Sequence, residues 1–214
     1  MKKEKTILFD LDGTLIDSTP AILESFKVTL SHFGSEIPSD KSIIQQIGHP
    51  LDIMFESIGV TPSKVDEHVA RYKEHYRKVS KLGTSLLENA KDAVELASLH
   101  ATLGVVTTKT GEYSKILLEH LGLMGYFEVL IGREDVIHPK PNPEPINKAL
   151  SKLQKDKKEC WMIGDTCMDI VAATQAGIES VAVTSGYASS NQLEECSSHI
   201  CENALEAVKL IIKT

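Results

Sequence analysis

From about residue 84 to its end, the chain alternates between short apolar runs and stretches with helical periodicity. The apolar runs are rich in β-branched residues and predict four strands, at residues 102–107, 129–131, 160–164 and 180–184. Helical stretches separate these runs, and another closes the chain. Strands separated by helices of this length form βαβ crossovers, which align the strands in parallel. The alternation therefore predicts an α/β fold built on a parallel sheet.

A fifth strand is expected at the N-terminus, where Thr6–Phe9 is apolar and β-prone. A short apolar run that ends at a glycine-containing turn is typical of a strand buried on both faces. Asp10 and Asp12 follow it, and because they are two residues apart their side chains share one face of an extended chain. Two carboxylates held close repel each other, so this pair requires a shared proton, a cation or a lysine nearby.

Between this first strand and the alternating region, the periodicity is helical only. Four amphipathic helices with short connections are expected between about residues 18 and 80. This block interrupts the α/β domain directly after its first strand. We therefore expect a core made of residues 1–16 and 82–214 and a four-helix insertion over residues 17–81, placed above the carboxyl end of the first strand.

The charge and hydropathy of the chain exclude several classes of partner. A net charge of −7 argues against a nucleic-acid backbone as the main partner, although a local positive site for a small anion can exist in an acidic protein. No uncharged stretch is long enough to span a bilayer, and the apolar run after the basic N-terminus is too short for an export signal. We therefore expect neither a membrane nor a nucleic acid as partner.

The cysteines are few for this length and lack the pairing of zinc ligands; they are Cys160, Cys167, Cys196 and Cys201. We expect reduced thiols in a cytoplasmic protein. The sequence leaves the oligomeric state open between a monomer and a homodimer.

Polar side chains stand where the predicted strands end. Open α/β sheets bind their ligands at the carboxyl ends of the strands. The residues in question are Asp10 and Asp12, Thr107, Thr108 and Lys109, Lys140 in a proline-rich loop, and Asp165 with Asp169. Most of them gain nothing structurally from these positions, so their convergence on one edge indicates a site for chemistry.

Ordinary structural roles compete with this interpretation. Asp12 could form a turn, Asp165 could cap a helix, and Asp169 is the carboxylate most open to a structural role. Other polar residues are expected to be solvated at the surface: Lys109, His49, His68 and His75.

In this order and at these strand ends, the residues resemble the motifs of the haloacid dehalogenase-like superfamily, specifically its phosphatases with a small helical cap. The match covers essentially the whole chain; it runs through Asp10-Leu11-Asp12-Gly13-Thr14, Thr107, Lys140, and Gly164-Asp165 through Asp169. The resemblance implies a Rossmann-like, doubly wound core whose inserted helices close over the site as a lid. Asp135-Val136 and Lys140-Pro141-Asn142-Pro143-Glu144-Pro145 look most similar to phosphoglycolate phosphatases and related pyrophosphatases.

The resemblance also implies a mechanism in which Asp10 takes the phosphoryl group as an aspartyl-phosphate. A carboxylate nucleophile divides one difficult displacement into two easier ones. Asp12 would protonate the leaving oxygen and then deprotonate the attacking water. Mg²⁺ would be held by Asp10, Asp165 and the carbonyl of Asp12, with Asp169 supporting it directly or through water.

Phosphate contacts follow from the same resemblance. Thr107 would donate a hydrogen bond to a phosphoryl oxygen, and Lys140 would neutralise charge on Asp10 and on the transferred group. Many relatives have Asn where this chain has Thr108, whose hydroxyl can still donate. His49, in Gly48-His49-Pro50-Leu51, is the candidate insertion residue for reaching the substrate.

The expected reaction is hydrolysis of a small phosphorylated metabolite, a monoester of the phosphoglycolate type. An inorganic pyrophosphatase or a sugar phosphomutase of the same superfamily is the alternative, since Asp12 argues only against dehalogenases and phosphonate hydrolases. A receiver-type phosphoacceptor module is a remote alternative, because receivers carry the acceptor Asp after the third strand, where this chain has Gly132-Arg133. A calcium loop beginning at Asp10 fails, since Leu15 and Ala21 replace the required Gly and Glu.

Overall fold

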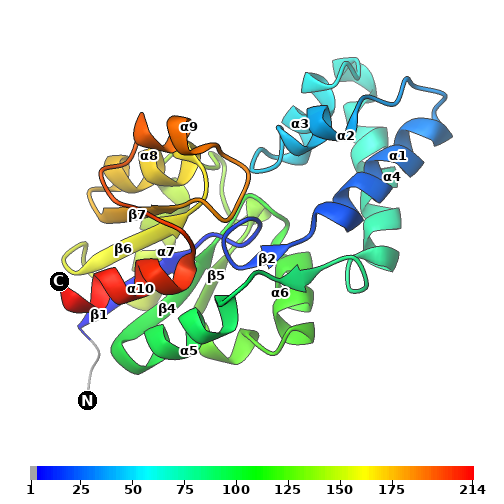
Figure 1. Cartoon of the computed structure of the whole chain (residues 1–214). Coiled ribbons are helices and arrows are strands. Elements are labelled where there is room, and N and C mark those ends of the chain that lie inside the picture. Colours follow the sequence, from blue (N-terminus) through cyan, green and yellow to red (C-terminus); the bar gives the residue numbers. More distant parts are fainter. Residues whose placement is uncertain (1–3) are drawn as a thin grey trace.

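A six-stranded parallel sheet forms the centre of the protein in the computed structural model, which describes residues 4–214 (Figure 1). The strand order is β5-β4-β1-β6-β7-β8, and each neighbouring pair is parallel. The strands are β1 (Lys5–Phe9), β4 (Ala101–Val106), β5 (Val129–Ile131), β6 (Cys160–Gly164), β7 (Glu179–Val183) and β8 (Ile200–Cys201). The predicted α/β class and its parallel sheet are thus confirmed, while the two-residue strand β8 was not expected because it is too short to show a period.

Helices cover both faces of this sheet. Helices α5 (Ala90–His100) and α10 (Ala204–Lys213) pack together on one face, and α7 (Glu144–Leu153) and α8 (Cys167–Ala176) pack together on the other. Ile7 and Phe9 of β1 join one hydrophobic cluster, while Leu8 between them joins the other. Burying each such side chain contributes about 1.5–3 kcal/mol, which explains the continuous apolar run of the central strand.

The chain order across the sheet fixes where a ligand can bind. From β1 the chain proceeds outward through β4 and β5, then returns to the other side of β1 with β6, β7 and β8. The carboxyl end of β1 therefore lies at the point where the winding reverses, and in open α/β sheets the binding crevice lies at such a point.

The predicted insertion consists of helices with their own hydrophobic core. They are α1 (Thr19–His32), α2 (Asp40–Ile44), α3 (Leu51–Ser57) and α4 (Val65–Val79), with the 3-10 turn η1 (Pro62–Lys64) before α4. Helix α1 packs along α4, and the aromatic rings of Phe26, Phe55 and Tyr72 meet at centroid distances of 4.6–6.1 Å. In Figure 1 these helices stand to one side of the sheet, beyond the ends of β1 and β4.

A short antiparallel pair of strands marks where the chain enters and leaves this group of helices. Strand β2 (Ile16–Asp17) pairs with β3 (Ser85–Leu86). Sequence periodicity did not predict this pair, because two residues are too few to reveal alternation. The remaining helical elements of the core are α6 (Gly111–His120), η2 (Met124–Tyr126), η3 (Arg133–Asp135) and α9 (Ser190–Glu194).

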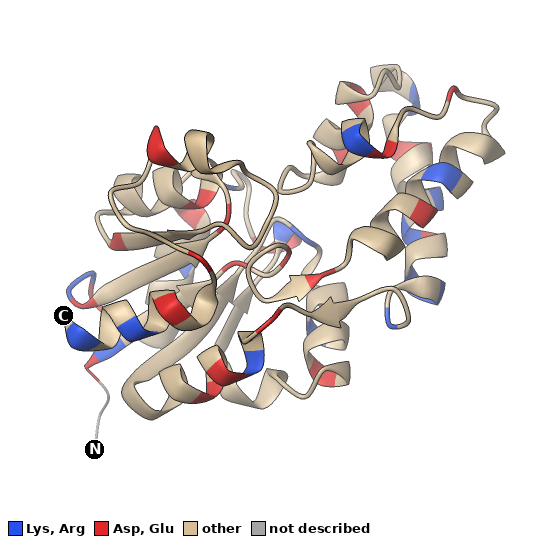
Figure 2. Cartoon of the chain, viewed as in Figure 1, with Lys and Arg blue, Asp and Glu red and all other residues tan. Residues whose placement is uncertain are grey.

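Acidic and basic residues are interspersed along the helices of the core and of the insertion, and acidic residues also occupy loops near the sheet edge (Figure 2). Among the described residues, no helix is both long and apolar enough to cross a membrane.

The expectations about the cysteines and about His68 were wrong. Cys167 and Cys196, 29 residues apart, form a disulfide, because the fold brings the first residue of α8 beside the segment after α9; Cys160 and Cys201 are free. His68 is buried instead of solvated, since its ring stacks on Phe33 and its Nδ1 lies 2.8 Å from the Lys64 carbonyl oxygen. His75 is half-buried.

Candidate active site

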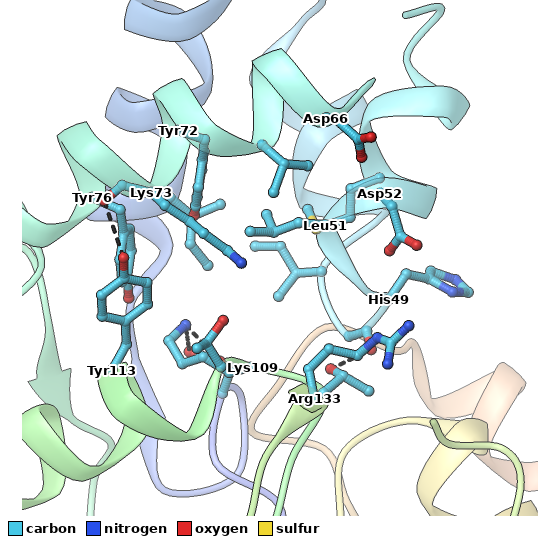
Figure 3. Close-up of a pocket in the computed structure, with 18 residues that line it drawn as sticks. His49, Leu51, Asp52, Asp66, Tyr72, Lys73, Tyr76, Lys109, Tyr113 and Arg133 are labelled. Carbon is cyan, nitrogen blue, oxygen red and sulfur yellow. Dashed lines mark hydrogen bonds and ion pairs between the residues drawn. The ribbon is translucent and has the colours of Figure 1, made fainter. Parts of the chain in front are cut away.

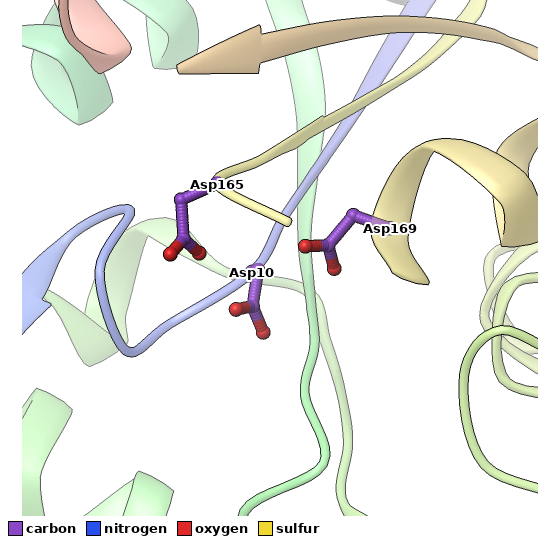
Figure 4. A group of neighbouring side chains, drawn as sticks. All are labelled: Asp10, Asp165 and Asp169. Carbon is purple, nitrogen blue, oxygen red and sulfur yellow. The ribbon is translucent and has the colours of Figure 1, made fainter. Parts of the chain in front are cut away.

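Three buried carboxylates converge where the winding of the sheet reverses (Figure 4). Asp10 directly follows β1, Asp165 directly follows β6, and Asp169 lies in the first turn of α8. One oxygen from each carboxylate lies within 4.8 Å of the others. The structure therefore gathers three of the residues expected at the metal site, although they are up to 159 positions apart, from residue 10 to residue 169.

Lys140 is the cation of this carboxylate centre. Its Nζ lies 2.8 Å from Oδ1 of Asp10 and 2.5 Å from Oδ1 of Asp169, and it also donates to the carbonyl of Val106 at 3.0 Å. The side chain is buried. The loop after η3 delivers it, and the Lys140-Pro141 peptide bond in that loop is cis. A lysine that is one of many in the sequence thus occupies the centre of the site.

Backbone and hydroxyl groups hold the other carboxylate oxygens. The N–H of Tyr187 donates to Oδ2 of Asp165 at 2.8 Å, and the hydroxyl of Thr14 donates to Oδ1 at 3.3 Å. Oδ2 of Asp169 accepts from both the N–H and the hydroxyl of Thr166, so both oxygens of Asp169 already have partners.

Two glycines let the backbone approach Asp165 closely. Gly13 has φ +81°, a conformation that side chains disfavour, and any side chain at Gly13 or Gly186 would overlap the Asp165 carboxylate. Gly13 is therefore required both for the backbone conformation of the turn and for the close approach to Asp165.

Burial and mutual repulsion shape the titration of these groups. Burial raises the pKa of Asp10 to about 6, although the charge of Lys140 opposes the shift. The pKa of Asp165 is held well above its usual value, first by burial and then by the charges of Asp10 and Asp169. Burial alone would lower the pKa of Lys140, but the charges of Asp10 and Asp169 outweigh it and raise that pKa above its usual value. Lys140 carries a single positive charge, so it cannot neutralise all three carboxylates when they are ionised.

These donors fit a hard divalent cation such as Mg²⁺. All three ligand groups are carboxylates, and hard cations prefer oxygen ligands. A cation among them would offset the excess negative charge and favour the ionised carboxylates. Asp10 and Asp165 could bind it directly, while the oxygens of Asp169 are engaged by Lys140 and Thr166.

Asp12 lies beside this centre, but its carboxylate faces a different partner. Nζ of Lys109 lies 2.8 Å from Oδ2 of Asp12, and the hydroxyl of Ser18 also donates to this carboxylate. The expectation that Lys109 is solvated was wrong: its side chain is 10% exposed, and Nζ lies 4.9 Å above the ring of Tyr76. The ring that covers Lys109 belongs to Tyr76 of helix α4, which lies 33 residues earlier in the sequence. A contact over this separation cannot be recognised from the local sequence pattern.

The two threonines after β4 have different surroundings. Thr107 is buried beside the centre, and its hydroxyl accepts the N–H of Lys109 at 3.2 Å. The hydroxyl of Thr108 instead donates to the carbonyl of Gly48 at 2.7 Å. The hydroxyl of Thr108 thus connects the sheet edge to the insertion, and its expected phosphate contact stays a prediction. His49, next to Gly48, is exposed.

A pocket of about 270 Å³ lies between the insertion and the carboxyl edge of the sheet, here called the insertion pocket (Figure 3). Asp12, Thr108 and Lys109 contribute from the core, and α4 contributes Tyr72, Lys73 and Tyr76. His49 and Arg133 also line it. Asp12 lines this pocket and lies two residues after Asp10, so the pocket adjoins the carboxylate centre.

Known proteins share both the sequence and the fold. A sequence profile described as haloacid dehalogenase-like hydrolase matches residues 7–183. The pyrophosphatase PpaX of Anoxybacillus flavithermus is 38% identical over 83% of this chain and 82% of its own. The phosphoglycolate phosphatase of Yersinia pseudotuberculosis is 31% identical over 87% of this chain and 83% of its own.

Among solved structures, a haloacid dehalogenase-like family hydrolase from Streptococcus pneumoniae is similar, with a TM-score of 0.88. The two are 27% identical, and the match covers 98% of this chain and 99% of that one. Together with the profile match, this similarity shows that the chain belongs to the haloacid dehalogenase-like hydrolases.

Proposed function

We propose that the protein is a Mg²⁺-dependent phosphatase that hydrolyses a small phosphate monoester of the phosphoglycolate type through an aspartyl-phosphate. The single observation that carries this proposal is the buried carboxylate centre of Asp10, Asp165 and Asp169 around Lys140. A sheet edge that gathers excess buried negative charge needs a cation, and carboxylates with a lysine suit phosphoryl transfer.

In the first step, an oxygen of Asp10 attacks phosphorus and the bond from phosphorus to the leaving oxygen breaks. Asp12 donates a proton to that leaving oxygen. In the second step, Asp12 accepts a proton from water as the water oxygen attacks phosphorus, and the bond to Asp10 breaks to release inorganic phosphate. Each such proton transfer is typically worth about 10²- to 10⁴-fold in rate.

The surrounding residues favour this sequence by position and charge. Lys140, 2.8 Å from Asp10, would offset negative charge on the transferred group, and the nearby Thr107 would donate to one of its oxygens. Mg²⁺, when bound, supplies further charge neutralisation at the carboxylates. The helical insertion would act as a lid that excludes water from the reaction.

Inorganic pyrophosphate is the second candidate substrate. The relatives named pyrophosphatase PpaX in Bacillus velezensis and Anoxybacillus flavithermus, at 35% and 38% identity, favour it. A sugar phosphomutase would use the same two aspartates, Asp10 and Asp12, and is the third.

The test is a side-by-side measurement with 2-phosphoglycolate, pyrophosphate and a hexose phosphate, with and without Mg²⁺. We expect phosphate release from at least one of the first two, dependent on Mg²⁺ and reduced at least about 10⁴-fold in Asp10→Asn. Isomerisation of the hexose phosphate without release would indicate a mutase. Absence of turnover with all three, or full activity in Asp10→Asn, would overturn the proposal.

A further inference from the structure

The insertion pocket contains polar groups for which the fold provides no partner. Within residues 4–214, Nζ of Lys73 makes no hydrogen bond or ion pair, and the hydroxyl of Tyr76 is buried without a hydrogen-bond partner. Both residues belong to α4 and line the pocket. Lys73 is half-buried, so its ammonium group is available to a ligand. The hydroxyl of Tyr76 is buried, and a buried polar group without a partner costs stability, which points to a ligand beside it.

The charges of the pocket are separated in space. Figure 3 shows Lys73 reaching into the pocket from the side where Tyr76 and Lys109 lie, while Asp52 and Asp66 lie on the other side. Lys109 is already paired with Asp12. The ammonium group of Lys73 therefore remains as the uncompensated positive charge on its side of the pocket.

The position of the Lys73 ammonium group places it near the leaving group of a bound substrate. This step rests on the proposed function: the transferred phosphoryl group lies at Asp10, and the leaving oxygen lies at Asp12. Since Asp12 borders the insertion pocket, the remainder of the leaving group extends into it. Lys73 then faces the leaving group and not the transferred phosphoryl group.

We propose that Lys73, assisted by the hydroxyl of Tyr76, binds a second anionic group that the substrate carries on its leaving portion. The substrate class is then a phosphate compound whose leaving group bears a carboxylate or a phosphate close to the scissile bond. A pocket of about 270 Å³ restricts this leaving group to a small one. Lys73 and Tyr76 thus determine specificity without touching the reacting atoms.

The first test compares Lys73→Met with wild type on substrates that differ in the leaving group. The readout is the ratio of kcat/KM for 2-phosphoglycolate or pyrophosphate to kcat/KM for p-nitrophenyl phosphate, whose leaving group has no second anionic substituent. We expect this ratio to fall about 10- to 100-fold, the usual effect of losing a hydrogen bond to a charged group. The change should appear mainly in KM, and Lys73→Arg should restore most of the ratio.

Lys78→Met is the matched control, because Lys78 belongs to the same helix but pairs with Glu74 at the surface. We expect it to leave the ratio unchanged. An unchanged ratio in Lys73→Met, or an equal fall in Lys78→Met, would overturn the proposal. If kcat/KM falls more for 2-phosphoglycolate, the subsite accepts a carboxylate; if it falls more for pyrophosphate, the subsite accepts a phosphate.

A binding measurement separates this proposal from the proposed function. In Asp10→Asn protein, calorimetric titration with 2-phosphoglycolate and with pyrophosphate reports affinity without turnover. Adding Lys73→Met should weaken the tighter of the two at least about 10-fold. If wild type hydrolyses no phosphate compound, the proposed function fails, yet this titration still tests the subsite; unchanged affinity would overturn it.

Tyr76→Phe distinguishes recognition from a structural role. Because the hydroxyl has no partner in the protein, its removal should not lower stability in a urea titration. The kcat/KM ratio should nevertheless fall several-fold. A loss of stability with an unchanged ratio would show that Tyr76 serves only the packing of the insertion and would remove it from the proposal.

Discussion

The carboxylate centre and the insertion pocket are neighbours, but they differ in how their polar groups are satisfied. In the centre, Lys140 bridges Asp10 and Asp169, and the backbone of Tyr187 holds Asp165. In the pocket, the ammonium group of Lys73 has no partner among the described residues. The carboxylates of the centre therefore have partners within the protein, whereas Lys73 would find its partner in the proposed ligand.

The two regions also differ in the elements that build them. The centre comes from strand ends and the first turn of α8, which the buried sheet holds in place. Much of the pocket comes from α4 and from the loop around Gly48, outside the sheet. Under the proposed function, this difference places the chemistry at the sheet edge and the choice of substrate in the helical insertion.

The largest expected effect comes from removing the cation of the centre. Lys140→Met keeps most of the side-chain volume but leaves the buried carboxylates without their lysine. Breaking a buried ion pair by removing one partner costs about 3–5 kcal/mol, and we expect a loss of this size in the free energy of unfolding measured in urea without Mg²⁺. Added Mg²⁺ should recover part of this loss, because a bound cation offsets the same charge.

The control for this change is Lys152→Met in α7, since Lys152 is half-exposed and its Nζ lies 3.6 Å from Oδ1 of Asp135. A surface ion pair contributes about 0–1 kcal/mol, so its loss should be small. If Lys140→Met were no less stable than Lys152→Met, the centre would not depend on its lysine, and its contrast with the pocket would be wrong.

The second-largest expected effect comes from removing the disulfide that anchors the start of α8 beside the carboxylate centre. The Cys167–Cys196 disulfide joins the start of α8, which carries Asp169, to the segment after α9. Crosslinking residues 29 positions apart stabilises the folded state by about 3–4 kcal/mol in the loop-entropy treatment. Cys196→Ser, or reduction by dithiothreitol, should lower the free energy of unfolding by this amount while leaving the pocket intact.

Cys201→Ser is the matched control, because Cys201 is free and half-buried. We expect its loss to be below about 1 kcal/mol, as for most substitutions that create no large cavity. Equal stability of the two variants, together with two additional reactive thiols in the native wild type, would show that Cys167 and Cys196 are reduced in solution.

This contrast also explains what the sequence could predict. Asp10 and Asp165 were identifiable because each directly follows a strand whose apolar run is distinct, and parallel strands bring their carboxyl ends to one edge. Lys140 was identifiable from the proline-rich loop that carries it. The ion pair between Lys140 and Asp10, and the position of an Asp165 oxygen within 4.8 Å of one from Asp10, then follow from the fold. The residues of α4 carried no such signal, because Tyr72 and Tyr76 have the spacing of any buried helical stripe.

The errors have the same origin. Lys109 and His68 were expected at the surface, yet both are covered by aromatic rings from distant positions, Tyr76 and Phe33. The disulfide could not be recognised because the separation of its cysteines carries no pattern. Each error concerns a contact between elements that are not adjacent strands, and periodicity within one element contains no information about such contacts.

The smallest expected effect concerns a bond that connects the two regions. The hydroxyl of Thr108, at the sheet edge, donates to the carbonyl of Gly48 in the insertion at 2.7 Å. Thr108→Val preserves the shape but leaves that carbonyl without its donor, which costs about 1 kcal/mol. Because the bond holds the loop that carries His49 against the core, its loss should raise KM less than about tenfold and leave kcat nearly unchanged.

Hydrogen exchange of the amides from Gln46 to Leu51 should accelerate in Thr108→Val, while exchange in β1 stays unchanged. Thr110→Val is the control, because Thr110 lines the same pocket and its side chain makes no capping bond at α6. A fall in kcat with no change in exchange would contradict the division argued above, since it would place Thr108 with the phosphate contacts of the centre. A change in KM and in the exchange of the Gln46–Leu51 amides, with kcat unchanged, would instead support the division, because it would show that the insertion affects substrate binding and not the chemical step.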